Sequence, residues 1–281
     1  MDAPPDKENC STFIQVAKIF REMEINVPKI IKTSSDEGFI LMTDFGSVQY
    51  LDILNSNVSE NNTQYKDAIN TLHNMQKKGK AYQEMFLPYS ESLIREEMSL
   101  FIDWFLDRHH GYQLSKSEIA RWQDCTHILT QNALSQPQVL VHRDFHSRNL
   151  MFLDSGNPGI LDFQDAVIGP ITYDLVSLLR DCYVSLNSDV VADFSLYFYK
   201  NLDEEDKAGI SHNQFTKFFD LMGIQRHLKA VGIFTRLNYR DGKSIYLNDI
   251  PRTLEYILTV AENYPEIIFL VELIKKLRSK G

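Results

Sequence analysis

The fold of this chain is decided by two stretches, VHRDFHSRNL at residues 141–150 and ILDFQD at residues 160–165. In the first stretch, Asp144 and Asn149 share one polar loop that follows a β-branched run. Asp162 ends a later β-like run, and hairpin strands between the loop and that run would bring the two close together. We therefore expect the Asn149 amide and the Asp162 carboxylate to meet near Asp144.

These three side chains supply the parts of a phosphoryl-transfer site. Mg²⁺ prefers hard oxygen ligands and needs few from the protein when phosphates supply the rest, so one amide and one carboxylate are enough. The further carboxylate, Asp144, could accept the proton of a hydroxyl group or orient that group. A metal, a positioned nucleophile and charge neutralisation are what phosphoryl transfer requires. The alternative interpretation is that Asp144, Asn149 and Asp162 are unrelated turn residues.

Around these stretches the pattern changes from helical to β-like and back. Short β-like runs at residues 139–141, 150–153 and 159–161 are separated by loops too short to hold helices. From Thr172 onward the chain reads as helices nearly to its end, apart from a polar surface connection at Asp203–Asn213. The sequence thus predicts a small β insert within a large helical part.

The N-terminal part is expected to be a small α+β piece. Apolar residues recur at helical spacing over Ser11–Met23, and β-like runs follow at Val27–Thr33 and Gly38–Thr43, joined by a polar turn. After Asp44–Gly46 the chain becomes mostly helical, from about Tyr50 onward. The helices expected next are an apolar stripe from Tyr65 to Met75, a strongly apolar helix over Ser90–Arg108, and a helix opened by a capping box at Ser115–Glu118.

The composition is that of a globular protein with an acidic surface. Of the 281 residues, 43% are hydrophobic and 24% charged, and 29 Lys and Arg against 38 Asp and Glu give a net charge of −9. The apolar material is sufficient for a core. An acidic balance argues against a nucleic-acid partner, which would need a basic patch. No apolar run approaches the ~20 residues that cross a bilayer, so we expect no membrane partner either.

The cysteines and the N-terminus indicate the compartment. The three cysteines, Cys10, Cys125 and Cys182, lie far apart and suggest no disulfide framework or zinc motif, which fits a reducing cytosol. The start, Met1–Asp6, is acidic and Pro-rich and does not resemble a signal peptide. We expect a cytoplasmic protein that acts as a monomer.

The loop resembles the catalytic loop of the protein-kinase-like superfamily, in which H-R-D-x-x-x-x-N precedes D-F. The variant in this chain, with DFQD in place of DFG, is similar to the aminoglycoside phosphotransferase and choline kinase branch. Residues 159–175, together with Met1–Pro5 and Leu41–Gly46, look closer still to the bacterial cell-wall sugar kinases that phosphorylate N-acetylmuramate and N-acetylglucosamine at the anomeric hydroxyl. The implied fold is a two-lobed, kinase-like α+β fold, with a truncated N-terminal lobe and hinge at residues 1–46 and a large helical lobe at residues 47–281.

The resemblance also implies roles for individual residues. Asp144 would be the catalytic base for the acceptor hydroxyl, and Asn149 and Asp162 would hold Mg²⁺. Asp174 would fix the backbone of the loop by hydrogen bonds, and His142 would be a buried structural support. The hinge, whose backbone would face the adenine of ATP, would consist of Met42, Thr43, Asp44, Phe45 and Gly46.

The implied activity is ATP-dependent phosphorylation of a hydroxyl of a small amino sugar in cell-wall recycling, most directly the anomeric hydroxyl of N-acetylmuramate or N-acetylglucosamine. The alternative of the same class is an aminoglycoside or amino-alcohol kinase. Aminoglycosides are polycations whose pockets need carboxylates, whereas N-acetylmuramate is an anion whose pocket needs an Arg or Lys. Both signs occur among the candidates on the acceptor side, so both alternatives stay open. These candidates are Asp165, Arg180, Asp181 and Arg226.

This sequence departs from the superfamily pattern at its start. Kinases of this superfamily normally begin with a glycine-rich hairpin over the phosphates, followed by a strand that bears a Lys. No Gly-rich loop precedes Ser11, and neither Lys7 nor Lys18 lies in a strand context. An alternative of a different class is therefore a nucleotide- or sugar-binding pseudokinase with impaired catalysis.

Overall fold

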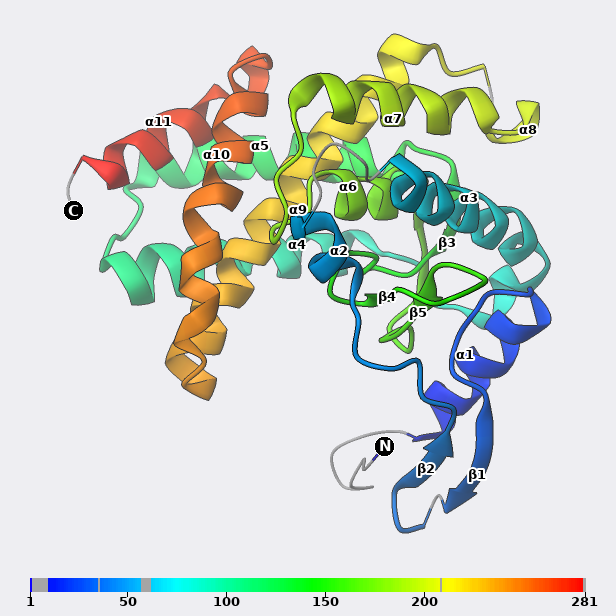
Figure 1. Cartoon of the computed structure of the whole chain (residues 1–281). Helices are drawn as coiled ribbons and strands as arrows, with labels where there is room; N and C mark the ends of the chain where they lie inside the picture. The colour runs from blue at the N-terminus through cyan, green and yellow to red at the C-terminus, as the bar shows by residue number, and fades with distance from the viewer. Residues whose placement is uncertain (2–9, 35, 57–61, 208, 280–281) are drawn as a thin grey trace. The chain divides into compact units, whose positions relative to one another are not determined.

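The computed structural model describes residues 1, 10–34, 36–56, 62–207 and 209–279 (Figure 1). By its internal contacts the chain divides into two compact units. Unit 1 comprises Met1–Pro88 and Val139–Asp206, and unit 2 comprises Tyr89–Gln138 and Lys207–Gly281. The expected lobe boundary after residue 46 falls inside unit 1 and stays a prediction. Residues 2–7, part of the N-terminal stretch considered in the sequence, lie outside the described residues.

The N-terminal helix and strands of unit 1 lie where the sequence predicts them. Helix α1 spans Cys10–Glu22, and strands β1 (Ile30–Ser34) and β2 (Phe39–Met42) pair antiparallel. Strand β1 begins three residues later than expected from the run that starts at Val27. The reason is a different partner, because the carbonyl of Asn26 accepts a hydrogen bond from the Ile160 amide at 2.8 Å. The segment before β1 is therefore tied to the β insert at Asn26, while Lys29, directly before β1, exchanges hydrogen bonds with Thr43, directly after β2.

The β insert consists of very short strands. Strand β4 (Leu150–Met151) pairs antiparallel with β5 (Gly159–Ile160), and all four residues are buried. Strand β3 (Gln138–Val141) pairs with β6 (Val167–Pro170), which the sequence did not indicate. Residues 139–162 thus form strands and loops, as expected, and the β4–β5 hairpin brings the residues on either side of it together.

Helices make up most of the rest of unit 1. Helix α3 buries the apolar stripe that was expected between Tyr65 and Met75. The expected polar connection at Asp203–Asn213 contains a short helix, α8 (Glu204–Lys207), none of whose residues is buried. Its Asp206 carboxylate pairs with Lys80 at 2.7 Å. The other helices of this unit are α2 (Tyr50–Ser56), α3 (Asn62–Gly79), η1 (Lys80–Met85), α6 (Tyr173–Leu179) and α7 (Ser188–Asn201).

Unit 2 is mainly helical, with short connecting segments between its helices. The helix expected over Ser90–Arg108 is divided into α4 (Glu91–Leu100) and a π-helical segment, η2 (Phe101–His109). The capping box at the start of α5 (Lys116–Leu134) is present, with Ser115 Oγ accepting from the Glu118 amide at 3.3 Å. The remaining helices are α9 (His212–Asp241), η3 (Ser244–Asp249), α10 (Ile250–Ala261), η4 (Pro265–Ile267) and α11 (Ile268–Arg278).

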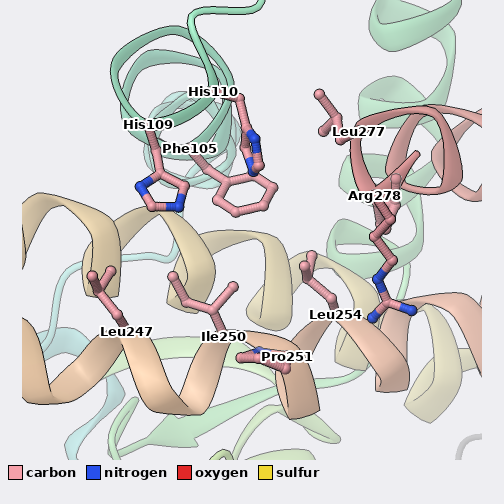
Figure 2. Close-up of a pocket in the computed structure, with 10 residues that line it drawn as sticks. Phe105, His109, His110, Leu247, Ile250, Pro251, Leu254, Leu277 and Arg278 are labelled. Carbon is pink, nitrogen blue, oxygen red and sulfur yellow. The ribbon is translucent and has the colours of Figure 1, made fainter. Parts of the chain in front are cut away.

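Unit 2 also holds an apolar cavity of about 320 Å³ (Figure 2). Phe105, His109 and His110 from the end of η2 face Ile250 and Leu254 of α10 across it. None of the residues that the sequence nominates for the site lines this cavity. Among the residues that the structure describes, no helix combines the length and the apolar character that a membrane span requires.

Candidate active site

The β4–β5 hairpin brings together Asn149 and Asp162, as the spacing of the sequence predicts. Asn149 precedes β4, and Leu161 follows β5 and donates its amide to the Asn149 carbonyl at 2.9 Å. The Asn149 side-chain amide Nδ2 donates to Asp162 Oδ2 at 3.5 Å and to the Asp144 carbonyl at 3.0 Å. Because Nδ2 faces these two oxygens, Oδ1 is the Asn149 atom left for another ligand. The hairpin thus gathers two oxygen-bearing side chains beside the backbone of Asp144.

Asp162 is held in a strained conformation with its carboxylate oriented. Its φ angle of +62° lies in the left-handed region, which costs a non-glycine residue free energy and is often found at functional sites. Gln164 Nε2 donates to Asp162 Oδ1 at 2.8 Å. The next residue, Phe163, is fully buried and packs its ring against Phe13 and Phe20 of α1 at 4.8 and 5.6 Å. The backbone of Asp162 is therefore held on both sides, by β5 before it and by the packed Phe163 ring after it, and its carboxylate is exposed.

His142 connects the loop to the end of β5 from a fully buried position. Its Nδ1 accepts from the Asp144 amide at 3.3 Å, which leaves Nε2 to donate to the Leu161 carbonyl at 3.0 Å. Burial lowers the pKa of His142 to about 4, because the charged imidazolium is poorly solvated there. At neutral pH the ring is uncharged, so its contribution to this site is a pair of hydrogen bonds.

Asp174, in the first turn of α6, lies under the start of the loop. Its fully buried carboxylate accepts from the amides of His142 at 2.7 Å and Arg143 at 3.0 Å. Arg143 also has a positive φ of +77°, which the flanking hydrogen bonds hold in place. A buried carboxylate that accepts two backbone hydrogen bonds is well satisfied and fixes the chain just before Asp144.

Of the expected hinge residues, Met42 ends β2, and Thr43 to Gly46 form a partly exposed connection after it. The Thr43 amide donates to the Lys29 carbonyl at 2.9 Å, and the Lys29 amide donates to Thr43 Oγ1 at the same distance. Asp44 Oδ1 accepts from the Gly46 amide at 2.8 Å, and Gly46 has a φ of +81°, which favours glycine. Phe45 lies against β5, since a Cβ atom at Gly159 would approach its ring to 2.7 Å. This connection is therefore packed directly on the β insert.

The four acceptor-side candidates have different surroundings. Asp165 is exposed, and its backbone carbonyl accepts from Arg143 at 3.4 Å. Arg180 is half-buried at the end of α6. Asp181 is only 2% exposed, and both of its carboxylate oxygens accept hydrogen bonds from backbone amides of this unit. Arg226 is buried on α9 in unit 2.

Arg226 lies on α9 between Gln225 and Lys229, two residues of a buried polar cluster. Glu97 of α4 accepts from the Tyr89 hydroxyl and from Gln225 Nε2, the latter at 3.2 Å. Its other oxygen pairs with Lys229 at 3.0 Å. A buried carboxylate needs this number of donors to offset its lost hydration. The cluster fixes α9 against α4 within unit 2.

Sequence reasoning missed two residues of the candidate site, Tyr183, which contacts the loop, and Gln164, which contacts Asp162. The guanidinium carbon of Arg148 lies 3.7 Å from the centroid of the Tyr183 ring. The same ring packs edge-on against the His146 ring, with 5.3 Å between the centroids. Gln164, which orients Asp162, was visible in the DFQD motif but was assigned no role. For Tyr183 no local signal existed, because only the tertiary fold brings the segment after α6 against the loop.

The side chains at this site suit a cation bound jointly with a ligand better than a metal held by the protein alone. The described residues hold no group of three or more His, Cys, Asp or Glu side chains that could bind a metal ion. Mg²⁺ needs few protein ligands when phosphates complete its octahedron. Asn149 Oδ1 and the Asp162 carboxylate are hard oxygen donors that fit this requirement.

Comparisons with known proteins place these features in context. Residues 1–206 match the model of the phosphotransferase enzyme family. The chain is 40% identical over 278 residues to an N-acetylmuramate/N-acetylglucosamine kinase of Pseudomonas aeruginosa, covering 99% of this chain and 81% of that protein. Kinases with the same name from Pseudomonas putida and Neisseria meningitidis are also 40% identical, covering 99% of this chain and 81% and 82% of the respective relatives.

Solved structures resemble the chain at lower identity. An ADP-bound aminoglycoside phosphotransferase, APH(2'')-Ib, superposes with a TM-score of 0.57 at 14% identity, covering 88% of this chain and 81% of the other. An ethanolamine kinase of Plasmodium vivax gives the same TM-score and identity, covering 88% of this chain and 72% of the other. At this level of identity the likeness concerns the fold.

Proposed function

Since this chain belongs to the phosphotransferase enzyme family, we propose that it transfers the γ-phosphate of ATP to the anomeric hydroxyl of N-acetylmuramate or N-acetylglucosamine. The chain is a kinase with the expected kinase-like α+β fold. The observation that carries the choice of substrate is the 40% identity, over 99% of the chain, to relatives that are named for these two sugars. The aminoglycoside and ethanolamine kinases resemble the chain at 14% identity and support only the fold.

Asp144 is proposed to be the catalytic base. Phosphoryl transfer passes through a loose transition state, so the base chiefly aligns the hydroxyl and accepts its proton late. Two backbone anchors support this role, since the Asp144 amide donates to His142 and its carbonyl accepts from Asn149. An anomeric hydroxyl is more acidic than an ordinary alcohol, which eases the proton transfer that Asp144 must perform.

Asn149 and Asp162 are proposed to hold Mg²⁺ together with the phosphates of ATP. When bound, the ion neutralises charge on the transferring phosphoryl group. The residues themselves fix the geometry: Asn149 Nδ2 turns toward the Asp144 carbonyl, and Gln164 holds Asp162 Oδ1. The hinge at residues 42–46 is proposed to face the adenine, and the compartment is proposed to be the cytoplasm, with the enzyme acting as a monomer.

A screen of ATP consumption tests the proposal. Wild-type protein is incubated with Mg·ATP and, separately, with N-acetylmuramate, N-acetylglucosamine, kanamycin or choline, with Asp144→Asn as the control for contaminating activity. We expect turnover with the two amino sugars and none with kanamycin or choline. Consumption that is stimulated by kanamycin or choline instead would assign the chain to the other acceptor class. Consumption with no acceptor, or nucleotide binding without turnover, would contradict the proposal.

A further inference from the structure

Ser147 is anchored through both of its backbone groups. Its amide donates to Asp181 Oδ2 at 2.8 Å, and its carbonyl accepts from the Leu51 amide at 3.1 Å. Both Ser147 and Asp181 are buried, so water does not compete for these bonds. Ser147 lies between Asp144 and Asn149 in the loop. Its two backbone hydrogen bonds therefore restrain the loop between the two residues that the proposed chemistry requires.

Helix α6 reaches the loop on both sides of Asp144. Asp174, in its first turn, accepts from the amides of His142 and Arg143. Asp181 follows directly after Arg180, the residue that ends the helix, and accepts from the amide of Ser147. All seven residues of α6 are buried, so the helix is a rigid spacer between the two carboxylates. The loop is thus held before Asp144 by α6 and after Asp144 by the segment that directly follows α6.

Asp181 also organises the segment that supports the rest of the loop. Its Oδ1 accepts from the Tyr183 amide at 2.8 Å. The Tyr183 ring contacts His146 edge-on and lies beneath the Arg148 guanidinium, whose carbon is 3.7 Å from the ring centroid. A cation over an aromatic ring at this distance is attracted by the ring's electrons. Through Tyr183, Asp181 therefore supports the two neighbours of Ser147 as well.

We propose that Asp181 is a positioning residue, which sets the distance between Asp144 and Asn149 by fixing the Ser147 amide. This assignment replaces the direct contact with the acceptor suggested by its charge alone, since both of its oxygens already accept backbone hydrogen bonds. The part of the inference that concerns turnover rests on the proposed function. The part that concerns the rigidity of the loop does not.

Asp181→Asn is the informative variant because it preserves the shape and removes one acceptor. One oxygen of the amide still accepts a hydrogen bond, but its NH₂ group then faces a backbone amide that has lost its partner. A shift of catalytic groups by ~1 Å costs up to ~10²-fold in rate, so we expect kcat to fall by ~10- to 100-fold. The KM values for ATP and for the sugar should stay within about twofold of wild type, because the loop shifts and no ligand contact is removed.

Two controls accompany this variant. Asp189→Asn removes an exposed carboxylate in the first turn of α7 and should leave kcat unchanged. Tyr183→Leu removes the ring beneath Arg148 but keeps the Asp181 carboxylate, and it should lower kcat in the same direction by a smaller factor. It also serves as the test variant if Asp181→Asn does not fold. Thermal unfolding identifies variants that remain folded.

Hydrogen exchange gives a readout that does not depend on activity. In Asp181→Asn, amides in a peptide spanning residues 142–151 should exchange ~10-fold faster than in wild type, while a peptide from α9 should be unchanged. If wild type shows no turnover with any amino sugar, the proposed function fails, and the exchange experiment alone decides the inference. Unchanged exchange and unchanged kcat would overturn it. An unchanged kcat with a large increase in the KM for the sugar would also overturn it, because that result marks a substrate ligand.

Discussion

The Asn149 side-chain amide donates to Asp162 Oδ2 at 3.5 Å, although the two residues are 13 positions apart. The hairpin between them accounts for this proximity, because the register that pairs Leu150 with Ile160 leaves Asn149 opposite Leu161. The two strands have only two residues each, so small changes in the turn at residues 152–158 would shift their register. The placement of both proposed metal ligands therefore depends on one short hairpin whose four strand residues are all buried.

Removal of the Asp162 carboxylate should abolish turnover that depends on Mg·ATP. The carboxylate is a proposed ligand of the ion, and an alanine offers no replacement oxygen. We expect Asp162→Ala to be inactive in steady-state assays across a Mg²⁺ titration. Asp154→Ala, an exposed carboxylate in the turn of the same hairpin, is the matched control and should behave as wild type. Full activity of Asp162→Ala would rule the assignment out.

Asp144→Asn should reduce kcat with little effect on nucleotide affinity. The substitution keeps the shape of the side chain but removes the negative charge and the proton acceptor. A positioned base contributes typically ~10²–10⁴-fold to the rate, and the acidity of an anomeric hydroxyl favours the lower end of that range. Steady-state kinetics measure kcat, and calorimetry measures ATP binding. If the variant lost ATP binding but kept its turnover at saturation, Asp144 would be a structural residue.

Gly159→Ala should weaken ATP binding through the hinge. The added Cβ atom would approach the Phe45 ring to 2.7 Å and Leu153 Cδ1 to 3.1 Å, so the ring must move. Overpacking of this kind costs about 1 kcal/mol or more of folding stability, and the displaced Phe45 ring shifts the proposed hinge, so the dissociation constant for ATP should rise. Calorimetric titration with a non-hydrolysable ATP analogue measures it, with Ser155→Ala in the exposed turn as the control. Unchanged affinity would show that the Phe45 segment does not contact the nucleotide.

His73 should make the fold less stable in mild acid. Burial lowers its pKa to about 4, and its ring stacks on Phe198 at 4.3 Å. The ordinary value is about 6.5, so the unfolded chain binds the proton more tightly, and the stability contributed by the neutral ring is lost as the pH falls from 6.5 toward 4.

His73→Phe keeps an aromatic ring in this position and removes the titration. Between pH 8 and pH 5 its free energy of unfolding should therefore rise by about 2 kcal/mol relative to wild type. Urea denaturation at each pH measures this difference. A difference that does not change with pH would contradict the inferred titration of His73, whatever its absolute value.

The sequence predicted the structure best where a short motif of defined residue types determines the local conformation. The HRD-to-DF spacing predicted the approach of Asn149 to Asp162, and the capping box at Ser115 lies where its residue types placed it. Strand β6 and the π-helical segment η2 were missed. The first is defined by a partner far away in the chain, and the second differs from an α-helix only in hydrogen bonding, which the apolar pattern of Phe101–His109 does not encode.

The acceptor-side residues show a further limit of sequence reasoning. Charge and position made Asp181 a candidate ligand for the substrate, but its carboxylate is buried against the amides of Ser147 and Tyr183. A buried carboxylate with two backbone donors cannot be distinguished from an exposed one by residue type. The burial of the Asp181 carboxylate, on which its proposed positioning role rests, arises only when the segment after α6 folds against the loop.

The position of the transferred phosphate on the sugar distinguishes an anomeric sugar kinase from every other proposed activity. Wild-type protein is incubated with Mg·ATP and N-acetylmuramate, and the product is examined by ³¹P and ¹H NMR. We expect one new phosphate monoester whose phosphorus is coupled to the anomeric proton of the sugar, with loss of the free reducing end and with ~10²-fold or slower formation of this product by Asp144→Asn. A phosphate on any other hydroxyl, or ATP hydrolysis that leaves the sugar unmodified, would contradict it.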